Sequence, residues 1–280
     1  MKKIIYLICL ILLFTGCSFT HKEETPDEQK EPSPSHNARE DSIEPESESE
    51  LEIQTEPQTE TPEQAETKPQ KKPQTIVLDP GHSAVIAPGT EPLGPGSQEY
   101  KSADAGGTCG VSTGIPEYEL TLNISLQLKQ ELENRGYTVL LTRESNDVPV
   151  SCIQRADVAN NAKAAAFVRI HANGSEDQSV TGAMTICTTP QSPYVPELYT
   201  ASRQLSDCIL NNFCAATGCT NSTVWETDSM SGNNWSQVPA TIVEMGYMSN
   251  PQEDVLLQTP DYQQKIVQGI ANGIDSFCGY

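Results

Sequence analysis

The apolar residues of this 280-residue chain are confined almost entirely to the part that follows residue 74. Residues 18–74 contain 16 acidic residues, 6 basic residues and eight prolines, but almost no large apolar side chains. Such a segment buries too little apolar surface to offset the entropy of ordering, so we expect a disordered linker. Residues 75–280 hold nearly all the aliphatic and aromatic content, and their length suits one folded domain with a single core.

The charge balance excludes one broad class of partner. The chain has 38 acidic and 17 basic residues, which gives a formal net charge of −21. Residues 75–280 are themselves acidic, with 22 acidic and 9 basic residues. A nucleic-acid-binding protein needs a basic surface to meet phosphates, so we expect no nucleic-acid partner.

The N-terminus has the pattern of an export signal. Lys2 and Lys3 precede an apolar run at residues 4–14, which is shorter than the ~20 apolar residues of a membrane-spanning helix. The run ends in Phe-Thr-Gly-Cys, which resembles a bacterial lipobox except that leucine is usual where Phe14 stands. The resemblance implies a signal peptide at 1–17 and lipidation of Cys17, with two acyl chains giving stable anchoring. An ordinary signal peptide is the alternative.

Both readings of the N-terminus predict export. Lipidation at Cys17 implies attachment to the outer face of the cell membrane, facing the cell wall. Residues 18–74 then form a tether, and a flexible chain of this length has a root-mean-square span of roughly 40 Å. That reach suits a domain that acts on material outside the membrane.

Predicted strands and helices alternate from Thr75 onward. Short apolar runs predict strands at 75–78, 137–142, 165–170, 183–188 and 240–243. Apolar residues at helical spacing predict helices at 151–162, 196–215 and 261–277. In residues 119–135 the apolar side chains fit both the alternating pattern of a strand and the spacing of a helix. The length of the segment favours a helix. This order predicts an α/β fold, a single layered domain with a twisted, mostly parallel sheet flanked by helices on both faces.

Residues 75–280 contain two histidines, and each follows a predicted strand. His82 comes four residues after the strand at 75–78, and His171 directly follows the strand at 165–170. Ligands collect beyond the carboxyl ends of such strands, so the two imidazoles could bind one ion. Glu117 could be a third ligand, leaving the open position of a catalytic zinc site. The alternative is that both histidines are structural.

A zinc site of this kind also needs a proton carrier. Zinc polarises a carbonyl and lowers the pKa of water to roughly 7, and a carboxylate then moves the proton to the leaving amine. Glu244 directly follows the strand at 240–243 and is the candidate. Three other acids compete with Glu117 for the third ligand position: Glu99, Asp104 and Glu119.

Five short motifs follow one another along residues 75–280. They are Leu-Asp-Pro-Gly-His at 78–82, Pro-Glu-Tyr-Glu-Leu at 116–120, Gly-Tyr-Thr-Val at 136–139 with Thr142-Arg143, Ile-His-Ala-Asn at 170–173, and Val-Glu-Met-Gly-Tyr-Met-Ser-Asn at 243–250. In this order they resemble the zinc-dependent N-acetylmuramoyl-L-alanine amidases of the amidase-3 family. The resemblance covers essentially the whole domain and implies a twisted mixed sheet flanked by helices.

The resemblance also implies an activity and its residues. It implies that zinc (Zn²⁺) is bound by His82, Glu117 and His171, and that Glu244 is the catalytic acid/base. It further implies that the substrate is peptidoglycan, in which zinc-activated water cleaves the amide between N-acetylmuramic acid and L-alanine of the stem peptide. A zinc peptidase acting within the stem, or a non-catalytic wall-binding lipoprotein, is the alternative, although all four site residues are present. We expect a monomer.

Three features leave alternatives open. The loop at 83–116 is longer than in most relatives and either shapes substrate access or is a neutral excursion. Trp235 either contacts a glycopeptide or belongs to the core. The domain has seven cysteines, an odd number, so at least one is free or pairs between chains. The spacing allows a Cys214–Cys219 bridge across a short loop, and the pairing of the cysteines stays open.

Overall fold

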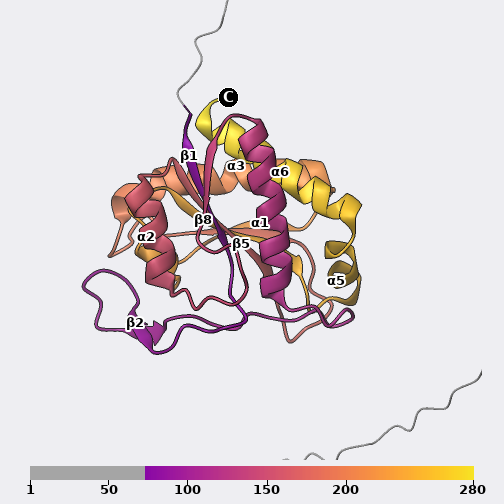
Figure 1. Ribbon diagram of the computed structural model, residues 1–280, viewed down its shortest axis with the longest axis horizontal. Helices are drawn as coiled ribbons and strands as arrows, with labels where there is room; N and C mark the ends of the chain where they lie inside the picture. Colours follow the sequence, from indigo (N-terminus) through magenta and orange to yellow (C-terminus); the bar gives the residue numbers. More distant parts are fainter. Residues whose placement is uncertain (1–72) are drawn as a thin grey trace, which may run out of the picture. The chain divides into compact units, whose positions relative to one another are not determined.

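The computed structural model describes residues 73–280 of the chain (Figure 1). The signal peptide predicted at 1–17, its Cys17 and nearly all of the predicted linker lie outside the described residues, so these expectations stay predictions. Among residues 73–280, no helix combines the length and the apolar character that crossing a membrane requires.

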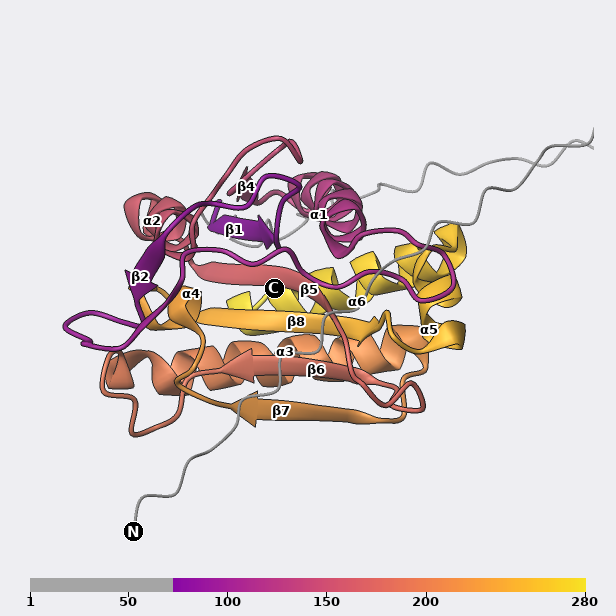
Figure 2. The ribbon, with the colours of Figure 1, turned by 90° about the horizontal axis from the view of Figure 1, so that it is seen from below.

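Six strands form one twisted sheet in the order β4-β1-β5-β8-β6-β7 (Figure 2). Their bounds are Thr138–Leu141, Thr75–Pro80, Ala166–Asn173, Ala240–Tyr247, Ala183–Cys187 and Ser222–Glu226, respectively. β4, β1, β5 and β8 are parallel, whereas β6 runs antiparallel to β8 and β7 parallel to β6. The mostly parallel sheet is thus confirmed, and the reversal at β6 makes the sheet mixed.

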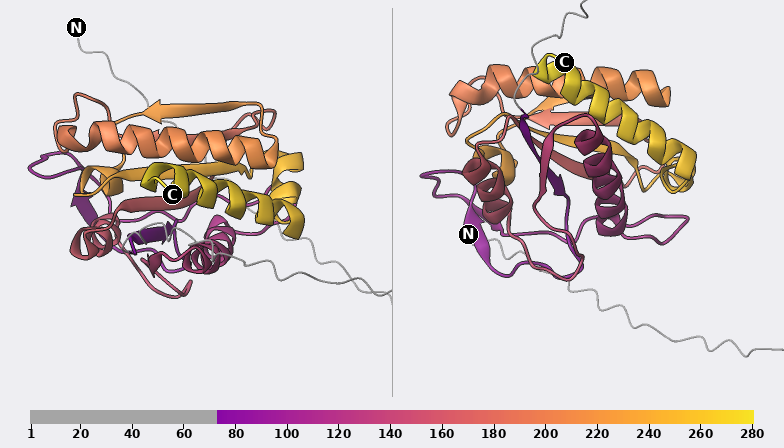
Figure 3. Two further views of the ribbon diagram at one scale, coloured as in Figure 1. Left: turned by 90° about the horizontal axis from the view of Figure 1, so that it is seen from above. Right: turned by 45° about the horizontal axis from the view of Figure 1, so that its top comes forward.

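Helices cover both faces of this sheet, as expected (Figure 3). The first face packs against α1, α3 and α6, and the second against α2 and the short α4; these helices span Glu117–Asn134, Tyr199–Thr217, Pro260–Cys278, Cys152–Ala162 and Ser231–Asn234. β1 shows why its sequence is a continuous apolar run. Ile76 and Leu78 enter the core on the first face, and Val77 enters the core on the second.

The segment that fitted two periods is the helix α1. Leu120, Ile124, Leu128 and Leu132 recur every four residues and are buried, whereas Leu126 is 44% exposed. The apolar alternation was therefore incidental, and the helical stripe determines the packing. α1 begins at Glu117, two residues earlier than predicted, so that Glu117 occupies its first position.

Sequence patterns missed the edge strand β7. Its side chains are half-buried or exposed, including Trp225 at 45% exposure, so it has no apolar run to mark it. Its extended backbone is held by pairing with β6. A helix at Pro251–Leu257, α5, was also not predicted, and the helix predicted at 196–215 begins with a 3₁₀ turn at Pro196–Leu198 that leads into α3.

The long loop contains a hairpin made of β2, Thr90–Pro92, and β3, Tyr100–Ser102. Trp235 is half-buried and donates from Nε1 to the Pro92 carbonyl at 2.8 Å, and Asn234 donates to the Leu93 carbonyl at 3.0 Å. Trp235 therefore holds the loop and packs against the core of the second face.

The Cys214–Cys219 bridge considered from the sequence is not formed, because both cysteines are free thiols. The Cys219 thiol donates instead to the Asn221 carbonyl, with Sγ and oxygen 3.1 Å apart. The short loop after α3 is closed by this contact and by Gly218, whose φ of 80° ends the helix.

Candidate active site

His82 lies in a constrained turn just beyond β1. Its φ is 60°, a left-handed conformation that a non-glycine residue keeps only where the surroundings impose it. Two buried arginines do so. Arg143 donates to the Pro80 and Gly81 carbonyls at 3.0 and 2.9 Å, and Arg155 donates to the His82 carbonyl at 3.1 Å. These contacts fix the backbone of the turn that carries the imidazole.

Asp79 organises the arginines beneath this turn. It is fully buried, and its two oxygens accept from Arg155 Nη1 and Arg169 Nε, each at 2.8 Å. Burial by itself raises the pKa of Asp79, but the two guanidinium groups and the Thr142 hydroxyl hold that pKa well below its usual range. We did not single out this network from the sequence. Its signal was a charged residue inside each of two apolar strands, which must be paired.

Three side chains converge at the carboxyl ends of β1 and β5. His171 Nδ1 lies 3.1 Å from His82 Nε2 and 3.1 Å from Glu117 Oε1, and the last two atoms are 3.2 Å apart. The approach needs glycine at position 81, because a Cβ there would stand 2.4 Å from the His171 ring. Among the described residues this is the group suited to hold a metal ion.

The spacing of these three atoms fits zinc. Bonds of about 2.0–2.1 Å in a tetrahedral site place neighbouring ligand atoms about 3.3 Å apart. His82 Nδ1 is 2.7 Å from the Ala105 carbonyl, a contact that keeps the proton on Nδ1 and leaves Nε2 as the donor atom. The second oxygen of Glu117 accepts from the Thr108 amide at 2.9 Å, so this carboxylate is oriented as well.

The electrostatics of the cluster suit a cation. Burial raises the pKa of Glu117, but hydrogen bonds from both histidines outweigh burial and hold that pKa well below its usual range. Burial lowers the pKa of His171 to about 4, so this imidazole is neutral at pH 7. Burial also opposes the charge on His82, yet the hydrogen bond to Glu117 raises its pKa. The carboxylate and one imidazole are already in the form that a metal ligand requires.

Glu244 faces the same space from β8. It pairs in register with His171, and its Oε2 is buried without a hydrogen-bond partner among the described residues. Burial first, and then the negative charge of Glu117, raises the pKa of Glu244 to about 8. A cation held by the three neighbouring side chains would favour the ionised carboxylate. Glu244 thus has an unpartnered carboxylate oxygen and borders the same two cavities as His82 and His171.

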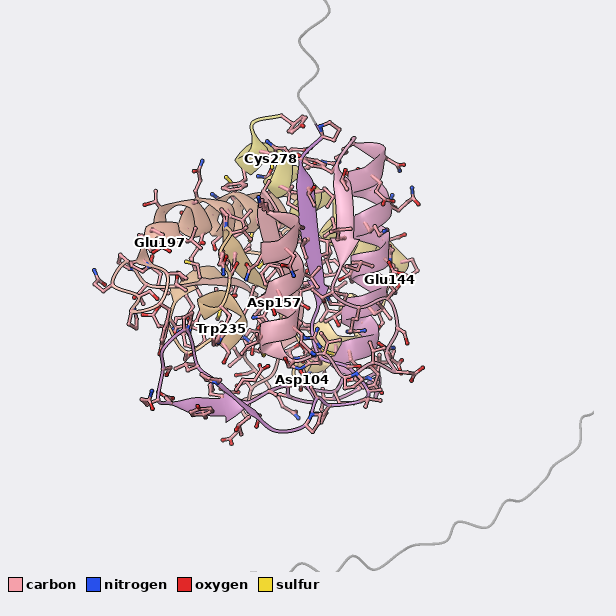
Figure 4. The ribbon with its side chains drawn as sticks, turned by 60° about the vertical axis from the view of Figure 1, so that its left-hand side comes forward. Asp104, Glu144, Asp157, Glu197, Trp235 and Cys278 are labelled. Carbon is pink, nitrogen blue, oxygen red and sulfur yellow. The ribbon has the colours of Figure 1, made fainter. Side chains whose placement is uncertain are left out.

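The three acids that compete with Glu117 for the third ligand position do not join the cluster of His82, Glu117 and His171. Glu99 and Glu119 are exposed. Asp104 lies in the loop beneath the ends of β1 and α2 (Figure 4), where it is buried with Oδ1 3.9 Å from Arg155 Nη2. The structure brings only Glu117, of these four acids, into contact with both histidines.

Two cavities open on the cluster, and His82, His171 and Glu244 border both. The first, of about 630 Å³, extends toward β3 and the segment 229–232. The second, of about 570 Å³, extends toward the segment 173–176. A chain-like substrate could therefore cross the cluster, with one arm in each cavity.

A His–Glu–His cluster beside a buried carboxyl, at the carboxyl ends of parallel strands, is the arrangement of a hydrolase site. In a comparison with known families, residues 76–276 match Amidase_3, described as N-acetylmuramoyl-L-alanine amidase. The chain belongs to this family, whose members are peptidoglycan hydrolases.

Individual relatives agree with the family match. The chain is 25% identical over 214 residues to the N-acetylmuramoyl-L-alanine amidase Rv3717 of Mycobacterium tuberculosis, covering 72% of this chain and 85% of that protein. It is 30% identical over 196 residues to the uncharacterized protein YqiI of Bacillus subtilis, covering 69% and 90%. Among solved structures, the amidase Ami1 of Mycobacterium smegmatis aligns with a TM-score of 0.67 at 26% identity, covering 74% of this chain and 98% of that one.

Proposed function

We propose that this chain cleaves the amide between N-acetylmuramic acid and L-alanine of the peptidoglycan stem, as a zinc enzyme and as a monomer. His82, Glu117 and His171 hold the metal, and Glu244 carries the proton. The observation that supports this assignment is the convergence of the three donor atoms, 3.1–3.2 Å apart, beside the unpartnered oxygen of Glu244.

Zinc bound at this site would supply the positive charge that polarises the scissile carbonyl and makes water more acidic. Side chains of the protein transfer the proton and position the metal ligand. Glu244 takes a proton from the attacking water and gives it to the amine of the departing L-alanine. The turn held by Arg143 and Arg155 keeps His82 in place without a change of conformation.

Digestion of purified peptidoglycan by the full chain tests this activity. We expect peptides that carry a new amino-terminal L-alanine, together with glycan that has lost its stems. Mass analysis of the products distinguishes the alternatives. Shortened stems still attached to sugar would indicate a peptidase acting within the stem, and binding to the wall without any product would indicate a non-catalytic wall-binding protein.

We further propose that the protein works outside the cytoplasm, held on the membrane by lipid at Cys17. Support comes from the lipobox-like tetrapeptide and from the family's substrate, which lies outside the membrane. A tether at 18–74 would raise the local concentration of the enzyme at the wall.

Cys17→Ser should release the protein from washed membranes, because no acyl chain can be attached there. Cys109→Ser is the matched control, because Cys109 is an exposed thiol of the folded domain. The Cys109→Ser protein should stay in the membrane fraction. Fractionation followed by immunoblotting measures both. Retention of the Cys17 variant in washed membranes would rule out lipid as the anchor.

A further inference from the structure

The two cavities beside the cluster differ in their charged groups. The first is bordered by three cations, Lys101, Arg155 and Arg169. The second has no lysine or arginine, and its lining is mainly backbone, hydroxyl and amide groups, with Glu176 as its one acid apart from Glu117 and Glu244. Backbone, hydroxyl and amide groups suit the hydroxyls of a sugar, whereas guanidinium groups suit carboxylates.

Arg169 has the one guanidinium edge in the first cavity that is not already used. Arg155 donates from all three nitrogens, to Asp79 and to backbone carbonyls. Lys101 donates to the Ser229 carbonyl at 2.9 Å. Arg169 donates from Nε to Asp79 and, at 3.5 Å, from Nη1 to Asn233, and no described residue accepts from its Nη2.

The guanidinium of Arg169 is held rigidly. Its side chain is 7% exposed, and Asp79 fixes one edge. The backbone at Gly232 packs against the group, because a Cβ there would stand 2.7 Å from Cζ of Arg169. A fixed, desolvated guanidinium recognises a carboxylate at little cost in side-chain entropy.

The acids of the first cavity do not occupy this donor. Asp104 faces Arg155, with 3.9 Å between the nearest charged atoms, and Glu99 is exposed. The charge of Arg169 acts on Glu244, but the salt bridge that Arg169 forms among the described residues is the one with Asp79. The free edge of Arg169 therefore remains available to an anionic group of the substrate.

We propose that the first cavity binds the stem peptide and that Arg169 Nη2 donates to its first free carboxylate, while the glycan lies in the second cavity. This inference rests on the proposed amidase function and deepens it. A stem peptide carries carboxylates, whereas the lactyl carboxyl of the glycan is consumed in the scissile amide. Charge thus sets the direction in which the substrate lies across the cluster.

The distances are compatible with this orientation. Arg169 precedes His171 by two residues on β5, so the two side chains share a face and their Cα atoms are about 7 Å apart. In an extended peptide, two residues also span about 7 Å. A carboxylate on the residue after L-alanine can therefore reach Arg169 while the scissile amide lies at the cluster.

The test compares two substrates on the full chain. Uncrosslinked peptidoglycan chains are prepared with the carboxyl of the second stem residue either free or converted to an amide. Because hydrogen bonds to charged groups are strong, we expect kcat/KM to be about 10- to 100-fold higher for the free acid. Equal rates on both substrates would overturn the inference and leave the amidase function intact. Absence of peptide release from either substrate would contradict the amidase function itself.

Variants assign the preference to Arg169. Arg169→Gln should bring the ratio of the two kcat/KM values close to one, and Lys101→Gln, which removes another cation of the same cavity, should leave that ratio unchanged. Gly232→Ala, in which the new Cβ displaces the guanidinium, should also reduce the ratio and serves if Arg169→Gln fails to fold. A ratio that persists in Arg169→Gln or Gly232→Ala, or is lost in Lys101→Gln, would overturn the assignment.

Discussion

Glu244→Gln is expected to lower turnover by about 10²- to 10⁴-fold, the usual contribution of a positioned proton carrier. Glutamine keeps the size of the side chain but cannot accept a proton from the attacking water. The loss falls on the transition state, so KM should change little. Steady-state kinetics on soluble peptidoglycan fragments measure both quantities.

Zinc content measured on the same Glu244→Gln preparation provides the control. We expect near-normal occupancy, because Glu244 lies outside the group of three side chains suited to hold the ion. Loss of zinc together with activity would make Glu244 a ligand and leave the proton carrier unidentified. Unchanged turnover with zinc bound would remove Glu244 from the mechanism.

Removal of an imidazole from the cluster should abolish metal retention and hydrolysis together. Changes to groups that merely orient a metal ligand typically cost 10- to 100-fold, so His82→Ala and His171→Ala should each cost more than about 100-fold in activity. Metal analysis after dialysis, beside the rate on peptidoglycan, measures the two effects. Full zinc and full rate in either variant would contradict the site.

Glu117 and Glu119 form a matched pair for the third ligand. Glu117→Gln removes a buried carboxylate that contacts both histidines, so zinc and activity should fall as in the histidine variants. Glu119→Gln makes the same chemical change on the exposed side of the same helical turn and should be mild. The reverse order of effects would show that the wrong carboxylate was assigned.

Sequence patterns predicted the buried central strands and missed the exposed edge strand β7. β1 and β5 are apolar because helices cover both of their faces, and β8 is largely buried as well. An apolar run in the sequence therefore predicts each of these strands. β7 lies at the sheet edge with exposed side chains, and its strand conformation comes from pairing with β6. The direction of β6 is likewise a property of the sheet, since a strand sequence does not specify parallel or antiparallel neighbours.

The candidate site was only partly predictable for a similar reason. Chain order placed His82, His171 and Glu244 after strands whose carboxyl ends meet at one edge. The third ligand had four candidates; the packing of α1 separates Glu117 from Glu119, and the path of the long loop keeps Glu99 and Asp104 out of the cluster. Two residues along a helix correspond to about 200° of rotation, which places Glu119 on the opposite side from Glu117.

The sequence by itself determined the alternation of strands and helices and the chemical groups available for a metal site, because composition and periodicity are local properties. Only the tertiary structure decided which carboxylate joins the two histidines, which arginine keeps a free edge, and that Trp235 holds a loop. These outcomes depend on contacts between residues far apart in the chain, such as His82 and His171, separated by 89 positions, and Glu117 and His171, separated by 54. Local patterns carry no information about distances across such separations.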